Sequence, residues 1–249
     1  MKTGALARWS GLVLLALLGT LSGMSAEAAD GDKSGIGTDR TRYIFNEGMR
    51  QTGVTLSNRT HESYLVQAWV RGLNPQNGEV TNASAPFFLK QPLVKALPDG
   101  RYGFQVIQTR PVMVKDRESL YLLSFKLIPA EKKKGETGYS RANVVLTYNV
   151  KLFYRPAKLK DGKVAEAAKS LRFRRKGDVL QVSNPTPYWI TFYSLKAGGH
   201  ALSEDALRRM VPPLGEAEYP LPSGVESGQV TWRVIDENGE VTKEEVSAL

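Results

Sequence analysis

Residues 141–156 read Arg-Ala-Asn-Val-Val-Leu-Thr-Tyr-Asn-Val-Lys-Leu-Phe-Tyr-Arg-Pro, and most of them favour an extended backbone. Side chains of a β-strand alternate between two faces, so four residues of the stretch share one face: Ala142, Val144, Leu146 and Tyr148. The stretch therefore predicts a long β-strand. Two interpretations of it are open: a sandwich strand with its apolar face turned inward, or an edge strand that offers its backbone and apolar face to another chain.

Short runs of β-forming residues lie on both sides of this stretch, with Gly, Pro and Asn between them. The expected strands cover residues 41–45, 53–57, 64–70, 87–97, 103–109, 119–127, 143–154, 179–183, 188–195 and 230–235. Helical periodicity is weak and is confined mainly to residues 164–171. Strands at this spacing, separated by turn residues, predict an all-β fold built from sandwiches.

The first residues have the order of a secretory signal: basic Lys2 and Arg8, a short apolar run over residues 11–19, and then small residues. We expect cleavage after residue 26, 28 or 29 and assign residues 1–28 to a signal peptide. The apolar run is shorter than the roughly 20 residues that span a bilayer. No second apolar run of spanning length follows it, so we expect a secreted protein without membrane insertion.

A domain boundary is expected at residues 156–162, where a proline and polar residues follow the long strand. The first sandwich is expected over residues 36–157 and a second, smaller one over residues 158–249. The chain has 249 residues and no cysteine, so disulfides cannot contribute to its stability. Two domains of this size can be stabilised by apolar burial alone.

The residue types needed for catalysis are sparse. The chain has two histidines, His61 and His200, and it has no HExxH pair, no Gly-rich phosphate loop and no GxSxG elbow. The sequence therefore predicts no catalytic residue, no metal site, no cofactor and no enzymatic activity. A net charge of +9 suits an acidic partner or an acidic envelope surface, and secretion argues against nucleic acid as a partner.

Six motifs occur in order along the chain: Asp39-Arg-Thr-Arg42, Tyr64-Leu-Val-Gln-Ala-Trp69, Asp116-Arg-Glu-Ser-Leu-Tyr-Leu-Leu123, Ile128-Pro129, Val150-Lys-Leu-Phe-Tyr-Arg-Pro156 and Asn184-Pro-Thr-Pro-Tyr188. Together they resemble the periplasmic pilus-assembly chaperones of the chaperone–usher pathway, the PapD-like family. The resemblance spans both expected domains. It implies a periplasmic protein of two immunoglobulin-like β-sandwich domains, set at an angle with a cleft between them.

The resemblance also implies a mechanism. A pilin subunit is a sandwich that lacks its final strand, and the chaperone inserts an edge strand of its own into the open groove. Carried over to this sequence, the donor positions fall on Ala142, Val144 and Leu146, and the role of Tyr148 stays open. Ala142 departs from the family because it fills less volume, so we expect its pocket to be weakly engaged.

Further residues match the family's polar sites. Arg42 and Lys151 match the two bases that grip the subunit's C-terminal carboxylate. Glu118 and Arg155 match an interdomain ion-pair network that is structural in the family. Its third member is either Glu237 or Asp236, and counting back from Gly239 favours Glu237.

The partners that the resemblance implies are pilin (fimbrial) subunits and an outer-membrane usher. The short loop over residues 129–141 resembles the short-loop subclass, which serves rod-like pili. Weak self-association through the exposed donor strand is also expected. The alternative is a structural or adhesive envelope protein built of β-sandwich domains, which would have no use for two bases in an interdomain cleft.

Overall fold

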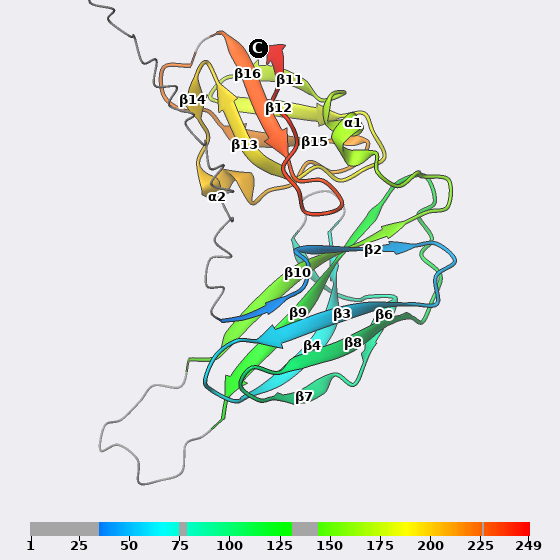
Figure 1. Ribbon diagram of the computed structural model, residues 1–249. Coiled ribbons are helices and arrows are strands. Elements are labelled where there is room, and N and C mark those ends of the chain that lie inside the picture. Colours follow the sequence, from blue (N-terminus) through cyan, green and yellow to red (C-terminus); the bar gives the residue numbers. More distant parts are fainter. Residues whose placement is uncertain (1–34, 75–78, 131–143, 226) are drawn as a thin grey trace, which may run out of the picture. The chain divides into compact units, whose positions relative to one another are not determined.

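The structure is a computed structural model that describes residues 35–74, 79–130, 144–225 and 227–249 (Figure 1). The expected signal peptide over residues 1–28 and the expected donor residue Ala142 lie outside these ranges. Among the described residues, no helix is long and apolar enough to cross a membrane.

The N-terminal sandwich pairs a four-stranded sheet, in the order β1-β3-β8-β6, with a six-stranded sheet, in the order β2-β10-β9-β4-β5 with β7 also beside β4. The strands of the first sheet are β1 (Ile36–Thr38), β3 (Gln51–Asn58), β6 (Phe87–Lys90) and β8 (Arg101–Gln108). Those of the second are β2 (Arg42–Asn46), β4 (Tyr64–Leu73), β5 (Val80–Ser84), β7 (Leu93–Ala96), β9 (Ser119–Pro129) and β10 (Leu146–Arg155).

Alternation along these strands builds the core. Val54 and Leu56 of β3 are buried from one sheet, and Leu123 and Phe125 of β9 are buried from the other. The ring of Phe125 meets that of Phe104 edge to face, with centroids 5.4 Å apart. Apolar residues at every second position therefore hold the two sheets together without a disulfide.

The C-terminal sandwich has a three-stranded sheet, β11-β12-β15, and a four-stranded sheet, β14-β13-β16-β17. Its elements are α1 (Val164–Ala168), β11 (Arg172–Lys176), β12 (Val179–Asn184), β13 (Phe192–Ala197), β14 (His200–Ala201), α2 (Glu204–Leu207), β15 (Gly215–Pro220), β16 (Gln229–Val234) and β17 (Glu245–Ala248). Its core includes Leu180, Tyr219, Trp232 and Val234, all buried.

Two expected strands differ from the structure. Residues 87–97 form two strands, and these belong to different sheets, because the chain turns at Gln91, which has a left-handed φ of 59°, and at Pro92. The strand expected over residues 188–195 begins only at Phe192, and before it Ile190 makes an isolated bridge to Val211. The prediction of single continuous strands was wrong at both places.

Apolar contacts connect the two sandwiches. Leu120 and Phe153 of the first form one buried cluster with Trp189 and Met210 of the second. Burying such side chains contributes about 1.5–3 kcal/mol each. This cluster lies next to the ends of β9 and β10, which carry the polar residues described below.

Candidate functional site

Arg42 and Lys151 are neighbours across two strands. β2 runs parallel to β10, and Arg42 is the direct partner of Lys151 in the register of this pair. Adjacent strands lie about 4.8 Å apart, so the backbones of the two residues are close although the residues are distant in sequence. Residues on paired positions share a sheet face, so both side chains rise from the same side of the sheet.

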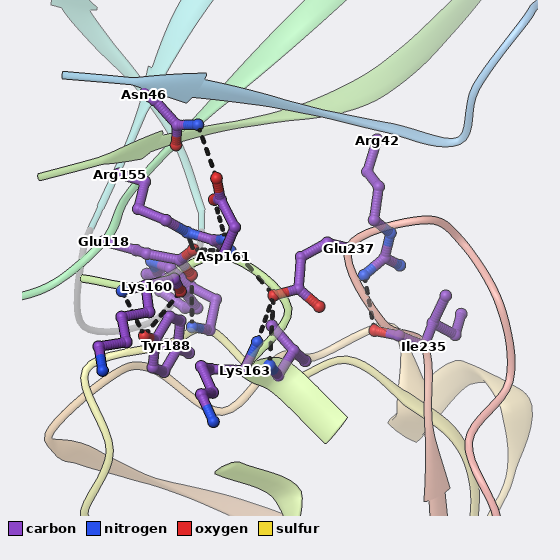
Figure 2. A network of polar contacts seen from close by, with 12 residues as sticks. Arg42, Asn46, Glu118, Arg155, Lys160, Asp161, Lys163, Tyr188, Ile235 and Glu237 are labelled. Atoms are coloured by element: carbon purple, nitrogen blue, oxygen red, sulfur yellow. Dashed lines mark hydrogen bonds and ion pairs between the residues drawn. The ribbon is translucent and has the colours of Figure 1, made fainter. Parts of the chain in front are cut away.

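Among the described residues neither cation is bonded to an acid, although Asp236, Glu118 and Glu237 act on Arg42 at longer range. Arg42 is buried, and its Nη1 donates to the backbone oxygen of Ile235 at 2.8 Å (Figure 2), while its Nε has no hydrogen-bond partner among the described residues. Neither Arg42 nor Lys151 forms an ion pair with any residue that the structure describes. Two adjacent bases without an acid partner make a site that favours a bound anion.

Burial lowers the pKa of both Lys151 and Arg42. It lowers the pKa of Lys151 to about 8, and the like charge of Arg42 lowers it as well. Burial also lowers the pKa of Arg42, whose guanidinium nevertheless remains charged. A carboxylate placed between the two would relieve the repulsion and supply the missing hydrogen-bond acceptor.

The first part of β10 has an open edge. β9 pairs with β10 from Leu146 to Tyr154, whereas β2 covers the opposite edge only from Lys151 to Arg155. Residues 146–150 therefore have no partner on that edge among the described residues. Val144 and Val145, just ahead of β10, are 63% and 45% exposed, and Leu146, its first residue, is 57% exposed, so three consecutive aliphatic side chains face solvent.

Tyr148 lies on the same face of β10 as Leu146 but contacts its own domain. Its ring packs against the N-terminal core, and its hydroxyl is 3.3 Å from Thr38 Oγ1 of β1. Further along this face Val150 and Leu152 are buried. The apolar face of β10 thus divides into an exposed part up to Leu146 and a part that belongs to the sandwich core.

A buried arginine lies near the end of β10 (Figure 2). Arg155 is 1% exposed and donates from Nε and Nη2 to Glu118 Oε1 at 2.9 and 2.7 Å. The other oxygen of Glu118 accepts the backbone N–H of Trp189, at 2.9 Å. Glu118 therefore satisfies groups from both sandwiches at once.

Glu237 also belongs to this network. Its Oε1 is 3.4 Å from Arg155 Nη1 and accepts the backbone N–H of Lys163 at 2.9 Å. Asp236, the other candidate from the sequence, instead accepts the backbone N–H groups of Asn238 and Glu240 within its own turn. The structure thus brings Glu118, Arg155 and Glu237 together.

Asp161 is a member that the sequence did not reveal. Its Oδ1 is 2.7 Å from Arg155 Nη1, shorter than the contact with Glu237, and its Oδ2 accepts from Asn46 Nδ2 at 3.1 Å. Asp161 lies in the polar connection at residues 156–162, where a single acid carries no distinguishing pattern. Its side chain is 66% exposed, so this bond is better hydrated than the one with Glu118.

Arg42 and Lys151 do not line the cavity that the two sandwiches share, and they are not part of a metal-binding cluster of described residues. A cavity of about 610 Å³ is lined by both sandwiches, including Leu73, Leu120, Trp189 and Pro213, but by neither Arg42 nor Lys151. The described residues contain no group of three metal-binding side chains. The candidate site is therefore an open strand edge that ends at two cations, and what it can do chemically is bind a strand and an anion.

Comparisons with known protein families cover almost the whole described chain. Residues 35–160 match the model of the N-terminal domain of PapD, a pili and flagellar-assembly chaperone. Residues 166–246 match that of the C-terminal domain of the pili-assembly chaperone PapD. Only residues 161–165 separate the two matches.

Individual relatives agree with this. The probable fimbrial chaperone protein ElfD of Escherichia coli K12 is 32% identical over 233 residues, which cover 93% of this chain and 94% of ElfD. The crystal structure of the E. coli chaperone DraB matches with a TM-score of 0.73 and 27% identity, over 87% of this chain and 98% of DraB. A chain in the structure of the Salmonella enterica SafA pilin with the SafB chaperone matches with a TM-score of 0.75 and 26% identity, over 87% of this chain and 97% of that one.

Proposed function

Since the chain belongs to the PapD family of pili-assembly chaperones, we propose that it holds fimbrial subunits in the periplasm by donating the open edge of β10 to their incomplete sandwich. The observation that carries the proposal is the exposure of Val144 and Leu146 beside a strand edge that has no partner in the described part of the chain. Family members are chaperones, not enzymes, so the candidate site is interpreted as a binding surface.

In strand addition the backbone of β10 and the side chains at its start have different roles. Backbone groups of residues 146–150 can form a ladder with a subunit strand whatever its sequence. Ala142, Val144 and Leu146 then fill the subunit's open groove, and each large apolar side chain contributes about 1.5–3 kcal/mol. Covering the groove also prevents edge-to-edge aggregation of subunits.

Arg42 and Lys151 anchor the subunit's C-terminal carboxylate in this proposal. The pair supplies charge-assisted hydrogen bonds, which are stronger than neutral ones. Neither base is bonded to an acid among the described residues, and this supports the assignment, because the bound carboxylate would then add a partner without displacing one. Glu118, Arg155 and Glu237 keep the sandwiches connected in this scheme and do not touch the subunit.

The last step of the proposed function is delivery of the bound subunit. The loaded chaperone passes its subunit to an outer-membrane usher, where a tighter final partner replaces β10 without a nucleotide. The short-loop subclass and weak self-association through the free strand are parts of the same proposal. The fimbrial chaperones among the relatives, and the pilin bound in the SafB structure, support pilin subunits as the partners.

The decisive experiment is recovery of the subunit from periplasmic extract with tagged chaperone. Arg42→Ala and Lys151→Ala should each abolish recovery, whereas Arg40→Ala, which removes an exposed cation two residues away, should not. Leu146→Asp should also abolish it, and Val246→Asp, at a 60% exposed valine on β17, should not. Melting temperatures of all variants control for folding.

Two outcomes would overturn the proposal. Normal recovery with both anchor variants would remove the carboxylate site. Wild-type protein that polymerises or stays on the cell surface without a bound subunit would instead favour a structural or adhesive envelope protein.

A further inference from the structure

The sheet face that carries Arg42 and Lys151 has one sign of charge. The six strands of this sheet contain six basic residues and no Asp or Glu: Arg42, Arg71, Lys95, Lys126, Lys151 and Arg155. Arg155 is neutralised by Glu118 and its other acid partners. The five other basic residues leave this face positively charged, so it can attract more negative charge than the single carboxylate of a chain terminus supplies.

Arg71 continues the row of the two proposed anchor residues across the sheet. Lys151 of β10 is the partner of Leu122 of β9, and Leu122 is in turn the partner of Arg71 of β4. Residues directly opposite one another in a sheet share a face, so Arg42, Lys151 and Arg71 lie on the same side. With about 4.8 Å between strands, the backbone of Arg71 is about 10 Å from that of Lys151.

The Arg71 side chain is directed toward β10 and is held there. Its Nε donates to Ser124 Oγ at 3.1 Å, and its Nη2 is 3.4 Å from Asn149 Oδ1 on β10. Its guanidinium also lies over the ring of Trp69, 5.7 Å from the centroid. A guanidinium has five N–H donors, and those of Arg71 beyond these two contacts form no bond with the described residues.

We propose that Arg71 is a specificity residue that binds an acidic side chain on the flank of the subunit held at β10. The inference rests on the proposed function, since it takes the occupant of this face to be the strand-bound subunit. Arg71 is held in place by its neighbours, and the strands of this sheet carry no acid. The face would therefore favour subunits with Asp or Glu opposite Arg71 and disfavour those with Lys or Arg at that position. Lys126 lies on the same face of β9, two residues after Ser124, and would add to the positive electrostatic potential of this face.

The test compares charge reversal at two places. Arg71→Glu is matched by Lys90→Glu, which makes the same charge change on the other sheet of the same sandwich. Affinity is measured for the subunit that co-purifies with wild-type chaperone. We expect Arg71→Glu to weaken binding about fivefold or more at low salt, and the difference to shrink in 1 M salt, where screening acts over about 3 Å. Lys90→Glu should stay within about twofold of wild type.

Two additions separate charge from folding and locate the contact. Arg71→Lys keeps the charge but loses the bonds with Ser124 and Asn149, so it should retain most of the affinity if charge is what matters. The chain has no cysteine, so Arg71→Cys carries a thiol-directed photo-crosslinker at one place only. The cross-linked subunit residue should lie beside an Asp or Glu, and reversing that acid should restore binding to Arg71→Glu.

Equal effects of Arg71→Glu and Lys90→Glu, or a cross-link to a neutral or basic surface, would overturn the inference. The proposed function would survive that result if Arg42→Ala and Lys151→Ala still abolished recovery. If the anchor variants bound normally, the proposed function itself would fall, and the two failures are therefore distinguishable.

Discussion

Lys151 should give subunit binding a measurable dependence on pH. Burial, and after it the charge of Arg42, lowers the pKa of Lys151 to about 8 in the free chaperone. A carboxylate bound between the two bases raises that pKa again, so the complex keeps a proton that the free protein loses. Affinity should therefore be constant well below pH 8 and should fall as the pH rises through and above 8.

The size of the effect follows from proton linkage. When binding takes up one proton, Kd rises about tenfold for each pH unit above the pKa of the free group. At pH 9 about nine in ten Lys151 side chains of the free chaperone are neutral, so binding should be roughly tenfold weaker than at pH 7, or about 1.4 kcal/mol.

Fluorescence anisotropy with a labelled peptide from the C-terminus of the co-purified subunit measures this directly. Ionic strength is held constant between pH 6.5 and 9.5, a range chosen to bracket a pKa of about 8. Lys151→Arg is the matched control, because arginine does not titrate in this range, and its Kd should be flat. A Kd of the wild type that does not change with pH, or the same slope in Lys151→Arg, would show that Lys151 does not take up a proton on binding.

Three further predictions concern the free chaperone. Arg155→Ala leaves Glu118 buried without its partner and should cost about 3–5 kcal/mol in urea denaturation, and a loss below about 1 kcal/mol would contradict a buried ion pair. Asp161→Asn should cost no more than about 1 kcal/mol because Asp161 is largely exposed, so a greater loss in the same assay would mean that Asp161 is a main support of Arg155. Lys151 has a lower pKa folded than unfolded, so the unfolded state binds more protons above pH 8 and wild-type stability should rise from pH 8 toward 10. Lys151→Met should remove that rise and should stabilise the protein at pH 7 by up to about 3 kcal/mol, and an unchanged pH profile would contradict the burial of the ammonium group.

The strands were predictable to the extent that alternation and turn residues define them. The strand expected over residues 143–154 corresponds to β10, and the one expected over residues 179–183 corresponds to β12. Alternation could not show that residues 87–97 change sheets, because the change depends on the backbone conformation of Gln91 rather than on hydrophobicity.

The site was less accessible from sequence. Nothing in the spacing of Arg42 and Lys151 indicates that they are paired, because a parallel pair depends on the whole topology between them. Only the resemblance to a family singled them out. Asp161 carried no signal at all, and the choice between Glu237 and Asp236 depended on which carboxylate the turn keeps for its own backbone.

The pairing of β2 with β10 has a consequence for which chains fit. Because β2 occupies the edge from Lys151 onward, an incoming strand has no room to continue past that point. In the proposed mode β2 acts as a stop that limits how far the subunit strand paired with β10 can extend before the subunit chain ends. A subunit with several extra residues at its end would meet β2 instead of the two cations, so chain length would be selected independently of sequence.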